Sequence, residues 1–370
     1  MSNKQRPKMI DIFDEHGWLD VDKMLKIAGQ TNFIFCIGAR GIGKSFNVLK
    51  WVLDHKKIFM YLRRTKTQFN VCKTDAASPF KALEAEANKG PFVLKSKSAD
   101  LTAIYTGIPD EEDEDKLIED DFIGYMANLA TFANLRSTSF QDVEVVIYDE
   151  FCPEPSERPI RGGDANALFN ALETIARNRE LQKDGKPLLV FCLANANDIG
   201  NDIYKTLGLV DKAAEMVETH QSVSVMNDRC CTLFQLDYSP ISEAKKHTSL
   251  YKLTAGASNQ FNEMALENKF YRDTSALIKS RNIKEYNPIC SIGGITIYRS
   301  KTADNRSKFK YYVSPYVTGT PRKFGSGKAE KQRFIKQYLP IWYSFLANYV
   351  CFESYSSYVL FQDAFDITKA

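Results

Sequence analysis

The sequence predicts an α/β fold in which helices cover a mostly parallel sheet. Three short apolar runs predict the strands, at residues 33–37, 143–148 and 188–194. Each run is shorter than an ordinary helix and rich in β-branched or aromatic residues. Segments with apolar residues at helical spacing, residues 44–55 and 163–180, lie between the runs. Such alternation of buried strands and helices is typical of a doubly wound parallel sheet.

The first run leads into a glycine-rich turn that is followed by a lysine and a hydroxyl. This strand–turn–helix context is what the pattern G-x-x-x-x-G-K-[ST] needs to indicate a phosphate-binding loop. Glycines let the backbone N–H groups turn inward around a polyphosphate, and the next helix points its positive end there. We expect Lys44 to reach the β- and γ-phosphates and the Ser45 hydroxyl to bind Mg²⁺. The predicted nucleotide-binding residues are Gly38, Ala39, Arg40, Gly41, Ile42, Gly43, Lys44 and Ser45.

The other two runs also end in side chains suited to phosphate chemistry. Asp149 and Glu150 close the second run, and Asn195 closes the third. Because the carboxyl ends of parallel strands face the ligand crevice, we expect these residues near the glycine-rich turn. Asp149 is expected to hold Mg²⁺ through its water shell, and Glu150 to polarise the attacking water. Asn195 is expected to contact the γ-phosphate or that water. The alternative for the acidic pair is a solvated strand end.

Composition favours a folded protein without a membrane segment, made of two domains or of one large domain with appendages. At 370 residues the chain is long for a single core. No apolar run approaches the ~18 residues of a membrane span, and the N-terminus lacks the apolar stretch of a signal peptide. The eight cysteines are scattered, without a C-x-x-C pattern, which indicates reduced thiols in a cytoplasm and no zinc site.

The charge is distributed unevenly. Residues 266–370 hold 17 Lys and Arg against 8 Asp and Glu, a net charge of +9, whereas the remainder carries −6. A basic C-terminal third suggests a polyanion partner, although a solvated basic surface is an equally good interpretation. Residues 205–265 show weak patterning and are predicted to connect an N-terminal domain, residues 1–204, to a C-terminal domain. Within the latter, residues 287–298 and 308–317 are predicted to be antiparallel strands.

Several blocks together resemble the DNA-packaging ATPases of phi-29-like tailed phages. The likeness covers about residues 24–204 and is faint beyond them. The run FCIGARGIGKS and the helix end RNRE make it more specific than a phosphate-binding loop alone. The blocks that carry it are residues 35–45, 61–64, 145–151, 168–180 and 193–196.

The resemblance implies an architecture and a function. That family joins a P-loop ATPase domain of the ASCE class, here residues 1–204, to a degenerate RNase H-like α+β domain, here residues 266–370. Its members form homopentameric rings at the portal vertex of a prohead in the host cytoplasm, where ATP hydrolysis drives double-stranded DNA inward. Some relatives use a structural packaging RNA, with which the basic C-terminal domain is compatible.

The resemblance also implies roles in trans. Arg177 matches the family's arginine finger, which reaches the ATP of the neighbouring subunit, and Arg179 competes for that role. Arg136 stands where a second cation acts in trans in the family, with an arginine in place of a lysine. The predicted opening strand of the C-terminal domain, residues 288–298, contains no acidic residue, so no nuclease activity is expected.

Other functions remain open on the sequence. A helicase or DNA-transfer ATPase would also use this loop, but the helicase series of motifs is absent. A nucleotide-switched assembly protein would bind ATP with little turnover, and it has no use for Glu150 as a base. A P-loop kinase would need an acceptor pocket and a lid that nothing marks.

Overall fold

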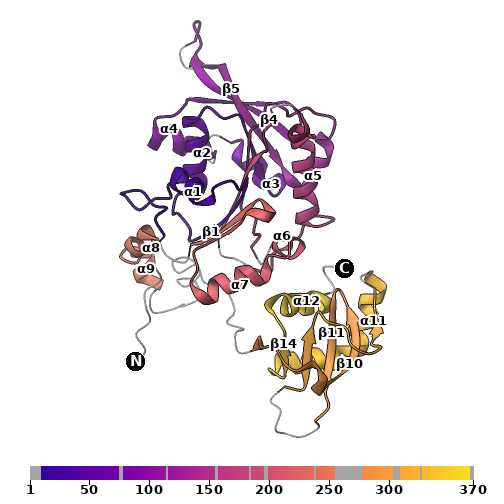
Figure 1. The fold of residues 1–370 in the computed structure, drawn as a ribbon. Helices are drawn as coiled ribbons and strands as arrows, with labels where there is room; N and C mark the ends of the chain where they lie inside the picture. The colour runs from indigo at the N-terminus through magenta and orange to yellow at the C-terminus, as the bar shows by residue number, and fades with distance from the viewer. Residues whose placement is uncertain are drawn as a thin grey trace. The chain divides into compact units, whose positions relative to one another are not determined.

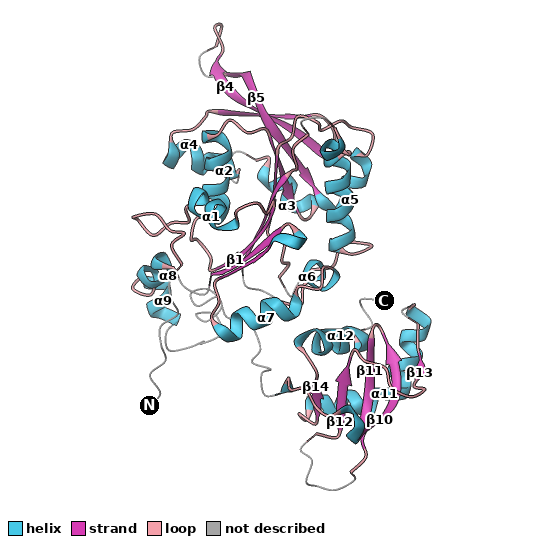
Figure 2. Ribbon diagram, viewed as in Figure 1, coloured by secondary structure: helices cyan, strands magenta, loops and turns pink. Residues whose placement is uncertain are grey.

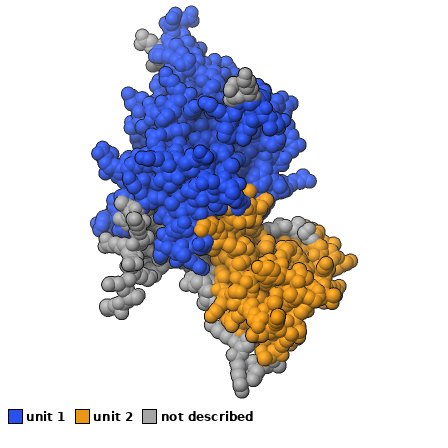
Figure 3. All heavy atoms as spheres, in the orientation of Figure 1, with its two compact units in different colours: residues 1–203, 215–271 blue, residues 204–214, 272–370 orange. Residues whose placement is uncertain are grey.

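The computed structural model describes residues 10–74, 78–113, 116–154, 157–182, 185–195, 199–236, 239–254, 277–302, 309–325 and 327–366. Contacts divide the chain into two compact units (Figures 1 and 3). The N-terminal unit comprises Met1–Ile203 and Glu215–Tyr271, and the C-terminal unit comprises Tyr204–Ala214 and Arg272–Ala370. No helix among the described residues is long and apolar enough to cross a membrane.

The N-terminal unit is built on one nine-stranded sheet with the order β3-β4-β5-β2-β6-β7-β1-β9-β8. Its central strands, from β5 to β9 in that order, run parallel, and the pairs at both edges are antiparallel. The mostly parallel α/β sheet is therefore confirmed. The strands are β1 (Phe33–Gly38), β2 (Phe59–Arg63), β3 (Phe92–Ser96), β4 (Leu101–Pro109), β5 (Leu117–Asn128), β6 (Val145–Asp149), β7 (Leu189–Ala194), β8 (Val223–Met226) and β9 (Cys231–Leu236).

Helices cover both faces of this sheet (Figures 1 and 2). The helices α1, α2 and α4 lie on one face and α5 on the other. The apolar side of α2 packs into the core, and its Val48 and Val52 belong to the same buried cluster as Phe191 of β7. The described helices up to residue 254, of which α6 and α7 fall partly within the C-terminal unit, are α1 (Val21–Ala28), α2 (Lys44–Asp54), α3 (Lys66–Cys72), α4 (Pro79–Ala87), α5 (Asp164–Ala176), α6 (Asp202–Thr206), α7 (Val210–Thr219), α8 (Pro240–Lys245) and α9 (Ser249–Thr254), with a 3₁₀ segment, η2, at Leu129–Leu135.

The prediction that residues 205–265 are a connecting region is wrong for β8 and β9. The strand β9 pairs in parallel with β1 along its whole length, and each of its residues is buried. Polar residues conceal this strand in the sequence, because Thr232 and Gln235 interrupt its apolar run. The structure accommodates Thr232 by a buried hydrogen bond of 2.6 Å between its hydroxyl and that of Thr31.

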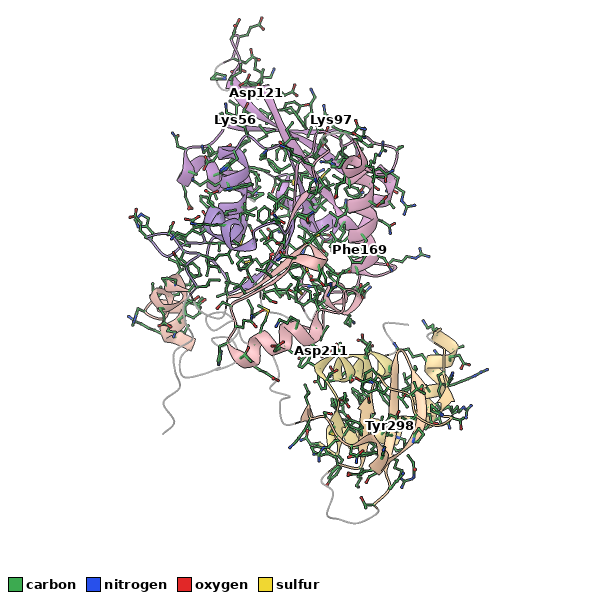
Figure 4. The ribbon with its side chains drawn as sticks, in the orientation of Figure 1. Lys56, Lys97, Asp121, Phe169, Asp211 and Tyr298 are labelled. Carbon is green, nitrogen blue, oxygen red and sulfur yellow. The ribbon has the colours of Figure 1, made fainter. Side chains whose placement is uncertain are left out.

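The C-terminal unit has its own sheet, with the order β13-β10-β11-β12-β14. The predicted strand at residues 287–298 is two strands, because Gly293 and Gly294, with φ of 56° and 85°, form a tight turn within it. Tyr298 (Figure 4) is buried on β11, and its hydroxyl donates to the Tyr316 carbonyl at 2.7 Å. The elements are β10 (Tyr286–Ile292), β11 (Ile295–Ser300), β12 (Tyr311–Ser314), β13 (Arg322–Lys323), β14 (Val350–Phe352), α11 (Lys328–Leu346) and α12 (Tyr355–Phe365).

A buried ion pair ties the end of β2 to the start of α5. The Arg64 side chain is 1% exposed, and its Nε donates to Asp164 Oδ2 at 2.7 Å. We expect Arg64→Ala to lower the free energy of unfolding by about 3–5 kcal/mol, because it leaves a buried carboxylate without its cation. Denaturant titration measures this loss. Arg333→Ala, at an exposed pair on α11, is the control and should have little effect. Equal stability of both variants would contradict the role of the pair.

Candidate nucleotide-binding site

The glycine-rich loop connects β1 to α2 at the carboxyl edge of the sheet. Gly41 and Gly43 adopt φ of 69° and 88°, a region that side chains disfavour. A Cβ on Gly43 would also lie 2.5 Å from the Asn47 side-chain nitrogen. The fully buried Ile42 anchors the loop to the core, and its carbonyl accepts from the Leu19 N–H at 3.1 Å. The glycine conformations and the buried Ile42 therefore fix the path of the loop backbone.

Lys44 opens α2 and is buried within the loop. Its Nζ donates to the carbonyls of Gly38 and Ala39, each at 2.8 Å, and to Asn195 Oδ1 at 3.2 Å. Burial lowers the pKa of Lys44 to about 8. A phosphate anion at this position would stabilise the ammonium, so the site suits a polyphosphate.

Ser45 and Asp149 meet although 104 positions separate them in the sequence. The Ser45 hydroxyl donates to Asp149 Oδ1 at 2.7 Å, while the Tyr61 hydroxyl donates to Oδ2 at 2.7 Å. These oxygen donors are the hard ligands that Mg²⁺ prefers. Among the described residues, no three carboxylate, histidine or cysteine side chains form a metal-binding group. The residues fit a Mg²⁺ ion that keeps water and phosphate oxygens in its shell, as Mg²⁺ usually does.

Glu150 follows β6 directly and adopts φ of 60°. Such a conformation is uncommon for a residue with a side chain and is often found at functional sites. Its carboxylate is 47% exposed and accepts from Arg63 Nη2 at 2.5 Å, while Nη1 of the same arginine donates to Asp149 Oδ2 at 2.9 Å. One guanidinium therefore holds both carboxylates.

The sequence analysis did not identify Arg63 as a site residue. Residues 61–64 were recognised as one block of the family resemblance. Successive residues of a strand point to opposite faces, and here Arg63 turns to the carboxylates while Arg64 is buried against Asp164. Applying the strand-end argument used for Asp149 to β2 would have placed Arg63 at the site.

Asn195 reaches the loop because β7 lies between β1 and β6 in the sheet. Together these residues enclose a pocket of about 230 Å³. The pocket is lined by Gly41, Gly43, Lys44, Ser45, Phe46, Asp149, Glu150, Ala194 and Asn195. Of the remaining predicted loop residues, Gly38 and Ala39 contribute carbonyls, Ile42 is in the core, and the Arg40 guanidinium pairs with Glu154. The structure thus brings the three strand ends to one place.

Arg177 and Arg136 lie near each other but do not line the pocket. Arg177 caps α5 and its Nη2 donates to the carbonyls of Arg136 and Thr138, at 2.9 and 2.8 Å. Arg179, two residues later, donates from Nη1 to the Val143 carbonyl just before β6 begins. This cluster therefore lies toward the amino end of β6, whereas Asp149 closes its carboxyl end.

The sequence of this chain is similar to those of known phage proteins. Residues 13–302 match the family model of the podovirus DNA encapsidation protein (Gp16). The chain belongs to this family. Curated relatives of this encapsidation protein include the DNA packaging protein of Bacillus phage phi29, 25% identical over 277 residues, which cover 73% of this chain and 70% of the relative. The DNA packaging protein of Bacillus phage B103 is 24% identical over 252 residues, 67% of each chain.

Two solved structures share the fold of this protein over nearly the whole chain. The bacteriophage Phi-29 viral genome packaging motor assembly matches with a TM-score of 0.61 and 16% identity, covering 95% of this chain and 99% of the other. The Phi-28 gp11 DNA packaging motor matches with a TM-score of 0.59 and 16% identity, covering 96% and 98%. At this identity the likeness concerns the fold.

Proposed function

We propose that this protein is an ATPase that drives viral double-stranded DNA into a prohead. The convergence of Lys44, Ser45, Asp149 and Glu150 around one pocket carries the proposal. A phosphate-binding loop alone would serve any nucleotide-binding protein, whereas a carboxylate beside the metal-binding acid serves hydrolysis. The family and its relatives are DNA encapsidation and DNA packaging proteins, which indicates that viral DNA is the molecule that is moved.

Each residue has a distinct part in hydrolysis. The loop N–H groups and Lys44 bind the β- and γ-phosphates, and Glu150 accepts a proton from the attacking water. Arg63 orients Glu150 and Asp149, and Asn195 contacts the γ-phosphate or the water. Ser45 and Asp149 would hold Mg²⁺, which neutralises charge on the phosphate oxygens.

The sheet order supports the ASCE class within P-loop ATPases. In that class an additional strand separates the loop strand from the strand with the metal-binding acid, and an adjacent glutamate is catalytic. Here β7 lies between β1 and β6, and Glu150 adjoins Asp149. The proposed ATPase domain comprises residues 1–204 together with β8 and β9.

The C-terminal domain is proposed to dock nucleic acid or the portal and to lack nuclease activity. Its described acidic residues do not converge with others into a metal-binding group, and Asp363 pairs with Lys205 at 2.5 Å.

The RNase H-like assignment stays a prediction. After the meander β10-β11-β12 and the helix α11, the next strand, β14, pairs in parallel with β12. The portal, a structural packaging RNA and the host cytoplasm are likewise expectations from the family.

DNA-dependent hydrolysis tests the proposed function. We expect double-stranded DNA to stimulate ATP hydrolysis by the full chain, with no sequence preference. The proposed contacts are to DNA phosphates. The logarithm of the affinity for DNA should therefore fall steeply and linearly with the logarithm of the salt concentration. Phosphate release and DNA titrations at several salt concentrations measure both. A salt-insensitive affinity or a clear sequence preference would contradict DNA packaging. Separation of the DNA strands would favour a helicase. Nucleotide binding without turnover would favour a nucleotide-switched assembly protein.

A further inference from the structure

The short helix α8 brings a lysine to the backbone of the nucleotide loop. Ser239 caps this helix by accepting from the Ser242 N–H at 3.0 Å, and both serines are buried. Pro240 packs against Gly17, where a Cβ would lie 2.7 Å from the proline ring. The start of α8 is thus firmly seated, and its last residue, Lys245, extends to the loop.

The contact between Lys245 and the loop depends on a glycine. Lys245 Nζ donates to the Arg40 carbonyl, and a Cβ on Gly41 would collide with the same ammonium group. Gly41 therefore has two functions, since it permits the left-handed turn of the loop and leaves space for Lys245. The loop motif explains the first function and not the second.

The charge of Lys245 has no counter-ion in its described surroundings. Among the described residues, no carboxylate lies within ion-pair distance of it, and a single carbonyl accepts from its three N–H donors. The side chain is half-buried, and desolvation lowers its pKa. Its positive charge also disfavours the protonated form of Lys44. Lys44 and Lys245 therefore both donate to carbonyls of this loop, and their two positive charges lack a full complement of balancing anions among the described residues.

We propose that Lys245 is a further nucleotide-binding residue, whose ammonium contacts a phosphate of the bound nucleoside triphosphate. This inference rests on the proposed nucleotide site and extends it to a residue far from the loop in sequence. A bound polyphosphate supplies the anion that the Lys245 ammonium lacks. The loop backbone that surrounds the phosphates includes the Arg40 carbonyl, which Lys245 already contacts. In chain order, α8 and α9 are the last described elements before residue 277, so the contact extends the site to a late part of the N-terminal unit.

The experiment separates the charge of Lys245 from its hydrogen bond to the loop. Lys245→Gln retains an N–H donor for the Arg40 carbonyl and removes the charge. Binding of Mg·ATP, Mg·ADP and AMP to the full chain is measured by calorimetry for this variant, for Lys245→Arg and for Lys44→Gln. The matched control is Lys246→Gln, since Lys246 is exposed and pairs with Glu243.

We expect Lys245→Gln to weaken ATP binding by about tenfold or more, as for a lost charge-assisted hydrogen bond. The loss should be smaller for AMP, and the dependence of ATP affinity on salt should become shallower. Lys245→Arg should retain binding, and Lys246→Gln should match the wild type. If Lys245→Gln does not fold, Lys245→Met under the same measurements replaces it.

Two results would overturn the inference while the proposed function stands. In the first, Lys245→Gln binds ATP with the wild-type affinity, whereas Lys44→Gln has lost ATP binding. The second is an equal loss for ATP, ADP and AMP with unchanged salt dependence, which would make Lys245 a support of the loop only. Failure of the wild type to bind nucleotide would overturn the proposed function, and the inference with it.

Discussion

Glu150→Gln is expected to lower the kcat of ATP hydrolysis by about 10²–10⁴-fold, the usual contribution of a general base. The substitution preserves the size of the side chain and so is compatible with the φ of 60° at this position. It removes only the ability to accept a proton from water. Nucleotide affinity should change little, because the loop and Lys44 supply the phosphate contacts. Phosphate release gives kcat, and calorimetry gives the affinity.

A matched control lies at the other end of the same strand. Glu144 precedes β6 at its other end, and its carboxylate pairs with Lys57 at 2.7 Å near the surface. Glu144→Gln should therefore hydrolyse ATP at close to the wild-type rate. Activity of Glu150→Gln within about threefold of this control would show that another group acts as the base.

Arg177→Ala is expected to abolish most hydrolysis in an assembled ring, by about 10³–10⁵-fold if the residue acts as an arginine finger. Arg177 does not line the pocket of its own chain, and it lies on the cluster toward the amino end of β6. A role in catalysis therefore requires the pocket of a neighbouring subunit. Mixing wild type with increasing fractions of the variant, with and without double-stranded DNA, measures the effect.

The shape of the mixing curve is the decisive result. Shared sites predict a loss of activity steeper than the fraction of variant. A strictly linear loss would remove the trans role of Arg177. Arg179→Ala is the comparison, since the Arg179 guanidinium donates to the carbonyls of Val143, Phe140 and Ile175. That variant should lose stability, and a steep mixing curve for it alone would transfer the finger role to Arg179.

The sequence by itself determined the glycine-rich loop and the strand ends that face it. The glycines of residues 38–45 are recognisable because their backbone conformations are a local requirement. Asp149 and Glu150 could be placed because a buried strand that ends in two acids has its carboxyl end at the crevice. Asn195 followed from the same argument. These predictions depend on short segments and one rule of sheet geometry.

Only the tertiary structure decided the contributions of residues whose partners are distant in the chain. The strand β9 was missed because its polar residues become compatible with burial once partners such as Thr31 lie beside them. Lys245 was missed because a cation on a short helix carries no local mark of the group it contacts. The position of Arg63 at a strand end was a usable signal, but its carboxylate partners belong to a different strand end. Long-range pairing creates these sites, and neither residue type nor periodicity encodes it.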